Sequence, residues 1–146
     1  MERSATWVFT INNYTDCDVA RLESLDKEKF FTVFGEEVGE KGTPHLQGYI
    51  RADLRIRRAQ VEKVLGGHAW CAVTHDEQSA IGYSIKDGRI HCNQECGWMV
   101  EVIRKAKEYG GEYKWLGSVW YNGETSPNYE PCRAYYNAWR YNERTQ

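Results

Sequence analysis

The stretch FFTVFGEEVGEKGTPHLQGYIRAD, residues 30–53, decides the fold of this chain. Two runs rich in β-branched and aromatic residues, 30–37 and 44–53, are separated by a short segment that contains two glycines. A short connection with glycine is typical of two neighbouring antiparallel strands. The stretch therefore predicts a β-hairpin, and the rest of the chain is interpreted around it.

Strand and helix patterns alternate on both sides of this hairpin. Val19, Leu22 and Leu25 recur at helical spacing, and the pattern 55–65 ends at two glycines that are typical of a helix C-terminus. The predicted strands are 6–11, 30–37, 44–53, 68–74 and 89–92, and the predicted helices are 16–30, 55–65 and 76–86. This order predicts an α+β fold, with a central antiparallel sheet of about five strands flanked by helices.

Length and charge restrict the class of protein. The chain has 146 residues, enough for one globular core, and its net charge is -2 with 27% charged residues. Such a balance excludes a generally basic nucleic-acid coat, so any contact with nucleic acid must be local. No run approaches the ~18 apolar residues of a membrane span, and the N-terminus lacks the apolar core of a signal peptide. We expect an intracellular protein without membrane contact.

The five cysteines are an odd number without a dense framework, which favours free thiols over disulfides. A zinc site remains an alternative, but it would have to be assembled from loosely spaced residues: His68, Cys71, His75, His91, Cys92 and Cys96. The short paired Cys-x-x-Cys spacing that makes a zinc motif specific is missing. We therefore favour ordinary, partly buried cysteines.

The second hairpin strand carries side chains that can bind a metal. His45 and Gln47 are two residues apart, so they project to the same face of the strand. Glu36 or Glu37 on the first strand must share that face, depending on the register. An imidazole, an amide oxygen and a carboxylate together favour Mg²⁺ or Mn²⁺. The alternative is that these residues are ordinary polar side chains on a solvated face.

A tyrosine and a lysine lie close together in the third predicted helix. Tyr83 and Lys86 are three residues apart, which places them on one helix face. A phenol can act as a nucleophile on a polarised phosphate, and a neighbouring cation stabilises the developing charge. The alternative is that Tyr83 is a half-buried packing residue.

Three motifs in order connect these observations. WVFTINNY (7–14), GTPHLQGYI (42–50) and YSIKDG (83–88) resemble the motifs of replication initiators from small circular single-stranded DNA viruses, closest to the circovirus and nanovirus type. That family shows W-x-F-T-x-N-N, then P-H-x-Q-G after a G-E-x segment, then Y-x-x-K. The resemblance covers about residues 7–97.

This resemblance implies an endonuclease of the histidine-hydrophobic-histidine (HUH) superfamily, with a sheet topology shared with RNA-recognition domains. It implies that Gln47 replaces the second histidine. By the same resemblance, the metal ligands are Glu37, His45 and Gln47, and the catalytic residues are the nucleophile Tyr83 and its helper Lys86. Glu37 is preferred to Glu36 because it matches the family's second acid after the glycine. Whether Asp76 or Glu77 adds a further ligand stays open.

The implied function is a metal-dependent, sequence-specific single-stranded DNA endonuclease and strand transferase. It would initiate rolling-circle replication through a 5′-phosphotyrosine intermediate, with Mn²⁺ or Mg²⁺ as cofactor. Its partner would be single-stranded DNA at a replication origin in the host nucleus, with host replication proteins left open as further partners. The alternative is a non-catalytic single-stranded nucleic-acid-binding module, although the aromatic K/R-G-F/Y-G/A-F-V-x-F/Y pattern of such domains is not found.

Candidate DNA contacts fall into two groups. The basic cluster consists of Arg51, Arg55, Arg57, Arg58 and Lys63. Its members are candidate phosphate contacts, or they form a solvated helix face. Asn12 and Asn13 in the first motif are either DNA contacts, as the resemblance implies, or turn residues.

The C-terminal part of the chain differs in composition. We expect residues 1–97 to form the nuclease core and the aromatic-rich residues 98–146 to form an extension packed on it. Within the extension, 100–109 has a helical pattern and 113–121 alternates like a strand. The aromatic side chains are expected mainly in a core, with stacking on exposed bases as the alternative.

Overall fold

A computed structural model describes residues 2–84, 89–93, 114–116 and 119–121. The chain divides into two compact units, residues 1–95 and residues 96–146. The first unit contains β1 (Arg3–Asn12), α1 (Asp16–Glu23), β2 (Phe30–Val38), β3 (Pro44–Arg57), α2 (Arg58–Val64), β4 (Trp70–Val73), α3 (Glu77–Ser84) and β5 (Arg89–Cys92). The order of strands and helices is the one that the sequence predicts.

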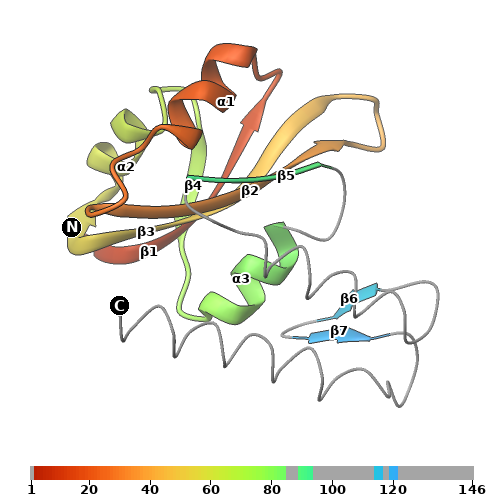
Figure 1. The fold of residues 1–146 in the computed structure, drawn as a ribbon. Helices are drawn as coiled ribbons and strands as arrows, with labels where there is room; N and C mark the ends of the chain where they lie inside the picture. The colour runs from red at the N-terminus through yellow and green to blue at the C-terminus, as the bar shows by residue number, and fades with distance from the viewer. Residues whose placement is uncertain (1, 85–88, 94–113, 117–118, 122–146) are drawn as a thin grey trace. The chain divides into compact units, whose positions relative to one another are not determined.

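The strands of the first unit form one sheet with the order β4-β1-β3-β2-β5 (Figure 1). Every neighbouring pair is antiparallel. The β2–β3 hairpin lies at the centre with β1, and β4 and β5 are the two edges. The predicted α+β fold with a five-stranded antiparallel sheet is therefore confirmed.

The two faces of the sheet are covered by different helices. Trp7, Phe9 and Ile11 alternate along β1 and are buried on one face, in the main core. Helices α1 and α2 cover this face with the buried side chains of Leu22 and Val61. Helix α3 lies on the opposite face, against β3 and β2 (Figure 1). The two faces are called the core face and the α3 face below.

Two predicted boundaries were wrong because long-range pairing and a turn override the local pattern. β3 continues to Arg57, where a helix was expected from residue 55, since Ile56 pairs with Ser4 beyond an irregularity in the β1–β3 pairing. Helix α1 ends at Glu23 instead of near residue 30. The carbonyl of Asp26 accepts hydrogen bonds from the amides of Lys29 and Phe30, so this segment is a turn.

In the second unit, the described residues form the antiparallel pair β6 (Lys114–Leu116) and β7 (Val119–Tyr121), with Trp115 opposite Trp120. The single strand expected over 113–121 is thus two strands. The helix expected over 100–109 lies outside the described residues, and the packing of 98–146 on the core stays a prediction. None of the described helices has the length and apolar character needed to cross a membrane.

Candidate functional site

The register of the hairpin places Glu37 directly opposite His45. The Glu37 Oε1 atom lies 3.4 Å from His45 Nε2, and the two side chains are only 9% and 18% exposed. Glu36 lies opposite Leu46, a core residue, and its side chain contacts groups on the core face. The alternation of the strand therefore brings Glu37, and not Glu36, to the side of His45.

The orientation of the His45 ring is set by the backbone. Its Nδ1 atom lies 3.2 Å from the carbonyl oxygen of Thr43, which accepts a hydrogen bond when Nδ1 carries the proton. Nε2 then presents a lone pair toward the carboxylate of Glu37. Two electron-rich atoms attract each other only through a proton or a cation, and a backbone-anchored imidazole is the usual arrangement of a metal-binding histidine.

Gln47 is the next residue of β3 on the same face, and it is buried. Its Nε2 donates to the carbonyl oxygen of Phe9 at 3.3 Å, and its Oε1 accepts from Thr10 Oγ1 at 3.0 Å. These two bonds fix which end of the amide is oxygen. An amide oxygen has two lone pairs, so Gln47 Oε1 keeps one for a further contact on the α3 face.

The donor types at this position suit a hard divalent cation. Within the described residues, no group of three or more His, Cys, Asp or Glu side chains is arranged so that it could hold a metal ion. The third candidate donor, the amide oxygen of Gln47, is not one of those types. One imidazole nitrogen with two oxygen donors and no thiolate matches the preference of Mg²⁺ or Mn²⁺, and it leaves positions for water and phosphate oxygens.

Helix α3 is anchored to the same face by a carboxylate at its start. Glu77 Oε2 accepts hydrogen bonds from Tyr49 Oη at 2.6 Å and from Arg51 Nη1 at 2.9 Å. The Arg51 guanidinium also lies over the ring of Phe31, 5.1 Å from its centroid. Tyr49 is four residues from His45, about 13 Å along the strand. This position makes Glu77 a tether for α3, which its sequence pattern does not indicate.

Tyr83 is near the other end of α3. Ala80, Ile81 and Ser84 are buried, whereas Tyr83 is 43% exposed. After Ser84 the chain must reach Arg89, which pairs with Glu36, and five residues span at most about 17 Å. The end of α3 therefore lies within about 17 Å of Arg89, at the end of the β2–β5 pairing where Glu36 lies. Lys86 lies outside the described residues.

A second cluster of charged groups occupies the core face and was missed by sequence reasoning. His91 Nδ1 lies 2.5 Å from Glu23 Oε1, and His91 Nε2 lies 2.9 Å from Glu36 Oε2. Tyr14 Oη donates to the other oxygen of Glu36 at 2.8 Å. Hydrogen bonds from His91 and Tyr14 lower the pKa of Glu36, while burial and that same bond raise the pKa of Tyr14. This network joins α1 to β2 and β5.

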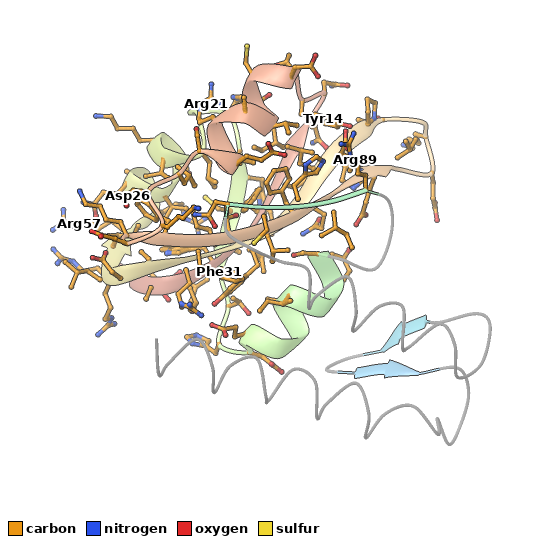
Figure 2. The ribbon with its side chains drawn as sticks, viewed as in Figure 1. Tyr14, Arg21, Asp26, Phe31, Arg57 and Arg89 are labelled. Atoms are coloured by element: carbon orange, nitrogen blue, oxygen red, sulfur yellow. The ribbon has the colours of Figure 1, made fainter. Side chains whose placement is uncertain are left out.

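The basic cluster lies toward the far end of β3. Arg57 lies opposite Arg3 and His45 lies opposite Asn12, nine residues apart on β1, which is about 30 Å along the strand. Figure 2 shows Arg57 and Arg89 at opposite ends of the sheet. Arg55 Nη2 donates to the carbonyl of Arg3, and Arg58 Nη1 donates to that of Cys71. DNA contacts by this cluster would therefore be distant from the candidate metal site.

The two asparagines of the first motif differ in their roles. Asn12 is exposed in β1 and lies opposite His45, so it borders the candidate metal site. Asn13 has φ 53, the left-handed conformation of a turn, and its amide donates to the carbonyl of Pro44. The turn interpretation thus describes Asn13, while Asn12 lies where a DNA contact is expected.

The described residues of the alternative zinc site are separated by the sheet, and Cys96 lies outside the described residues. His68 and Cys71 belong to the β4 edge, whereas His91 and Cys92 belong to the β5 edge, with three strands between them. His68 Nε2 instead lies 3.3 Å from Asp18 Oδ1, and Cys71 is buried. Cys17, Cys71 and Cys92 are free thiols.

Known proteins resemble the part of the chain that contains this site. The model of a family described as putative viral replication protein matches residues 4–87. The replication-associated protein of goose circovirus is 39% identical over 97 residues, covering 64% of this chain and 30% of that protein. That of canary circovirus is 40% identical over 90 residues, covering 61% and 28%. The master replication protein of subterranean clover stunt virus is 33% identical over 98 residues, covering 66% and 32%. The chain thus spans about a third of the length of these relatives.

Proposed function

The chain belongs to the family of putative viral replication proteins, and we propose that it nicks and rejoins single-stranded DNA at a viral replication origin. In this proposal Tyr83 is the nucleophile, and Glu37, His45 and Gln47 hold one Mn²⁺ or Mg²⁺ ion. The protein acts in the host nucleus during rolling-circle replication. The observation that carries the proposal is the approach of Glu37 to His45 across the hairpin, 3.4 Å between Oε1 and Nε2.

Two of the three proposed ligands are held in position by hydrogen bonds to neighbouring groups. His45 is oriented by the carbonyl of Thr43, and Gln47 by Thr10 and the carbonyl of Phe9. The pleat of β3 presents both side chains to the α3 face. A bound divalent ion would withdraw charge from the scissile phosphate. Prior orientation of the ligands means that little ordering is required when metal and DNA bind.

Tyr83 provides the covalent step. Its Oη attacks the phosphorus, a bond from Oη to phosphorus forms, and the bond from phosphorus to the 3′ oxygen breaks. The phenol loses its proton and the departing 3′ oxygen gains one, so a free 3′-hydroxyl and a 5′-phosphotyrosine result. The phosphodiester bond energy is kept in the adduct. Attack by a 3′-hydroxyl reverses the step and rejoins the DNA without a nucleotide cofactor.

The remaining residues have supporting roles in this proposal. Glu77, through Tyr49 and Arg51, holds α3 against the sheet and so fixes the height of Tyr83 above it. Asn12 borders His45 and is available to DNA that reaches the metal. Lys86 keeps its proposed role of stabilising the developing charge. Arg55, Arg57 and Arg58 would contact phosphates of DNA farther from the metal site. Arg51 would contact a phosphate while its guanidinium also remains bonded to Glu77.

A covalent-adduct assay tests the proposal. The protein is incubated with Mn²⁺ and a pool of labelled single-stranded oligonucleotides, and adducts are separated on a denaturing gel. We expect a labelled protein band that Tyr83→Phe abolishes. Tyr14→Phe is the matched control, because Tyr14 bonds Glu36 on the core face and should leave the band in place.

The same assay tests the metal ligands with a second matched pair. His45→Ala should abolish the Mn²⁺-dependent band, whereas His68→Ala should not, because His68 pairs with Asp18 away from the site. Retention of the adduct in Tyr83→Phe would show that another residue is the nucleophile. Unchanged nicking in His45→Ala would refute the proposed metal site.

A further inference from the structure

Trp70 is an exposed aromatic side chain on an edge strand. It is 59% exposed, whereas Trp7 on the neighbouring strand is 1% exposed. A large apolar ring left in water contributes little to the stability of the fold, because its burial is what stabilises it. Its exposed position in β4 leaves the ring available to contact another molecule.

The register between β4 and β1 determines the face to which Trp70 projects. Cys71 lies opposite Phe9, and both are buried in the main core. Trp70 lies opposite Thr10, one residue away, and alternation sends both to the α3 face. Trp70 is thus on the face that carries His45 and Gln47, although it is far from them in sequence.

Trp70, Thr10 and Gln47 form a continuous row across three strands. Thr10 pairs with Trp70 on one side and with Gln47 on the other, and its hydroxyl is hydrogen-bonded to the Gln47 amide. With neighbouring strands about 4.8 Å apart, Trp70 lies roughly 10 Å from Gln47 along this row. A nucleic-acid strand whose phosphate is held at the candidate metal site would have its neighbouring bases within reach of the indole.

The surroundings favour a nucleic-acid base over a protein surface. A protein-binding patch is a contiguous exposed apolar area, but the apolar neighbours of Trp70 on this face, Ala72 and Val8, are partly buried, and Trp70 lies next to Thr10 in the row that continues to the polar Gln47. Single aromatic rings beside polar groups are characteristic of sites for single-stranded nucleic acid, where each base presents a flat π-face to an aromatic side chain. β4 is an edge strand of the five-stranded sheet, so no strand of this sheet lies on the outer side of the Trp70 ring.

We propose that Trp70 is a stacking platform for an unpaired DNA base adjacent to the phosphate bound at Glu37, His45 and Gln47. The inference rests on the proposed function for the identity of the strand, and it adds a binding contact that none of the three sequence motifs contains. Stacking of this kind is tolerant of sequence, so Trp70 contributes affinity and positions the strand without selecting the origin.

Binding to two oligomers of equal charge isolates the contribution of the bases. The probes are a fluorescein-labelled oligothymidylate of about 20 nucleotides and an abasic deoxyribose-phosphate oligomer of the same length. Fluorescence anisotropy gives Kd for each, without added metal so that no cleavage occurs. We expect the wild-type protein to prefer the thymidylate, and Trp70→Ala to weaken its binding roughly 5- to 150-fold with little change for the abasic oligomer.

Two further variants separate stacking from a loss of structure. Trp70→Phe keeps an aromatic face and should retain most of the preference for thymidylate. Leu54→Ala removes an apolar side chain that is 70% exposed elsewhere on β3, and it should bind both oligomers as the wild type does. If Trp70→Ala keeps the wild-type preference, or if the wild type has none, the stacking role is wrong.

The adduct assay, run in parallel, separates this inference from the proposed function. Adduct formation by a protein whose thymidylate preference does not depend on Trp70 would refute the stacking role and leave the nuclease in place. A preference that depends on Trp70 without any adduct would support the stacking role and refute the nuclease.

Discussion

Gly48 connects the first two motifs physically. It lies opposite Phe9 in the β1–β3 pairing, and the Phe9 ring lies directly over it. A Cβ atom added at Gly48 would be 2.2, 2.5 and 2.7 Å from three atoms of this ring. Ordinary contacts begin near 3.4 Å, so the ring would have to withdraw by about 1.2 Å. The glycine of the P-H-x-Q-G motif thus makes room for the phenylalanine of the W-x-F-T motif.

The energetic consequence of Gly48→Ala follows from the position of that ring. Phe9 has no exposed surface and packs among core residues, so it has no free space in which to move. Overpacking a filled core costs about 1–3 kcal/mol and occasionally more. The shortfall here is large and the contact is with a rigid ring, so we expect a loss near 3 kcal/mol in the free energy of unfolding.

Urea denaturation followed by far-UV circular dichroism measures this loss. Gly39→Ala is the matched control: its Cβ would lie 3.7 Å from the nearest atom, so its stability should change little. Phe9→Leu makes room at the same contact. The double variant with Gly48→Ala should therefore lose less stability than the two single losses added together, by about 1 kcal/mol or more. Strict additivity would refute the claim that Gly48 accommodates the Phe9 ring.

Two further predictions concern the groups that fix the elements around the site. The depressed pKa of Glu36 means that its ionised form stabilises the fold; this contribution is fully present above the ordinary pKa of 4.5 and is lost as pH falls through the lower pKa of the folded state. Glu36→Gln should therefore lower the free energy of unfolding by about 1–3 kcal/mol at pH 7. In urea titrations, the difference in stability between wild type and variant should shrink below about pH 4.5. A constant difference down to strongly acidic pH would contradict this. Glu77→Ala should release α3 and speed amide hydrogen exchange in that helix by roughly 30-fold, which corresponds to a loss of about 2 kcal/mol, with little effect on exchange in β1. Tyr49→Phe removes only one of the two hydrogen bonds and should speed exchange in α3 by a smaller factor. Unchanged exchange in α3 of Glu77→Ala would show that Glu77 is not its anchor.

Most of the fold could be predicted because local patterns agree with the long-range pairing. The hairpin turn, the alternation in β1 and the glycines after α2 each act within a few residues. The end of β3 could not be predicted, because Ile56 is held in the strand by Ser4, more than fifty positions earlier. Apolar residues continue at helical spacing beyond Glu23, but the carbonyl of Asp26 closes a turn there. The local pattern therefore predicted a longer helix α1 than the structure contains.

The candidate site was predictable in its residue types but not in its geometry. Sequence alone left Glu36 and Glu37 equivalent, since the choice depends on a register that only the paired strand fixes. The tether formed by Glu77 and Arg51 joins residues 26 positions apart, and the pattern of neither segment indicates it. Trp70 carried a usable signal, because alternation with the core residue Cys71 sends it to the opposite face.

In the proposed site, one divalent ion binds between Glu37 and His45 on the α3 face. Manganese titration followed by electron paramagnetic resonance of the free ion measures this binding directly, at pH 7 and without DNA. Glu36→Gln and Glu37→Gln are the same substitution at adjacent residues whose side chains project to opposite faces of β2. We predict that Glu37→Gln weakens Mn²⁺ binding at least about tenfold, as His45→Ala does, while Glu36→Gln binds like the wild type. Equal binding by both glutamine variants, or loss only in Glu36→Gln, would contradict the site.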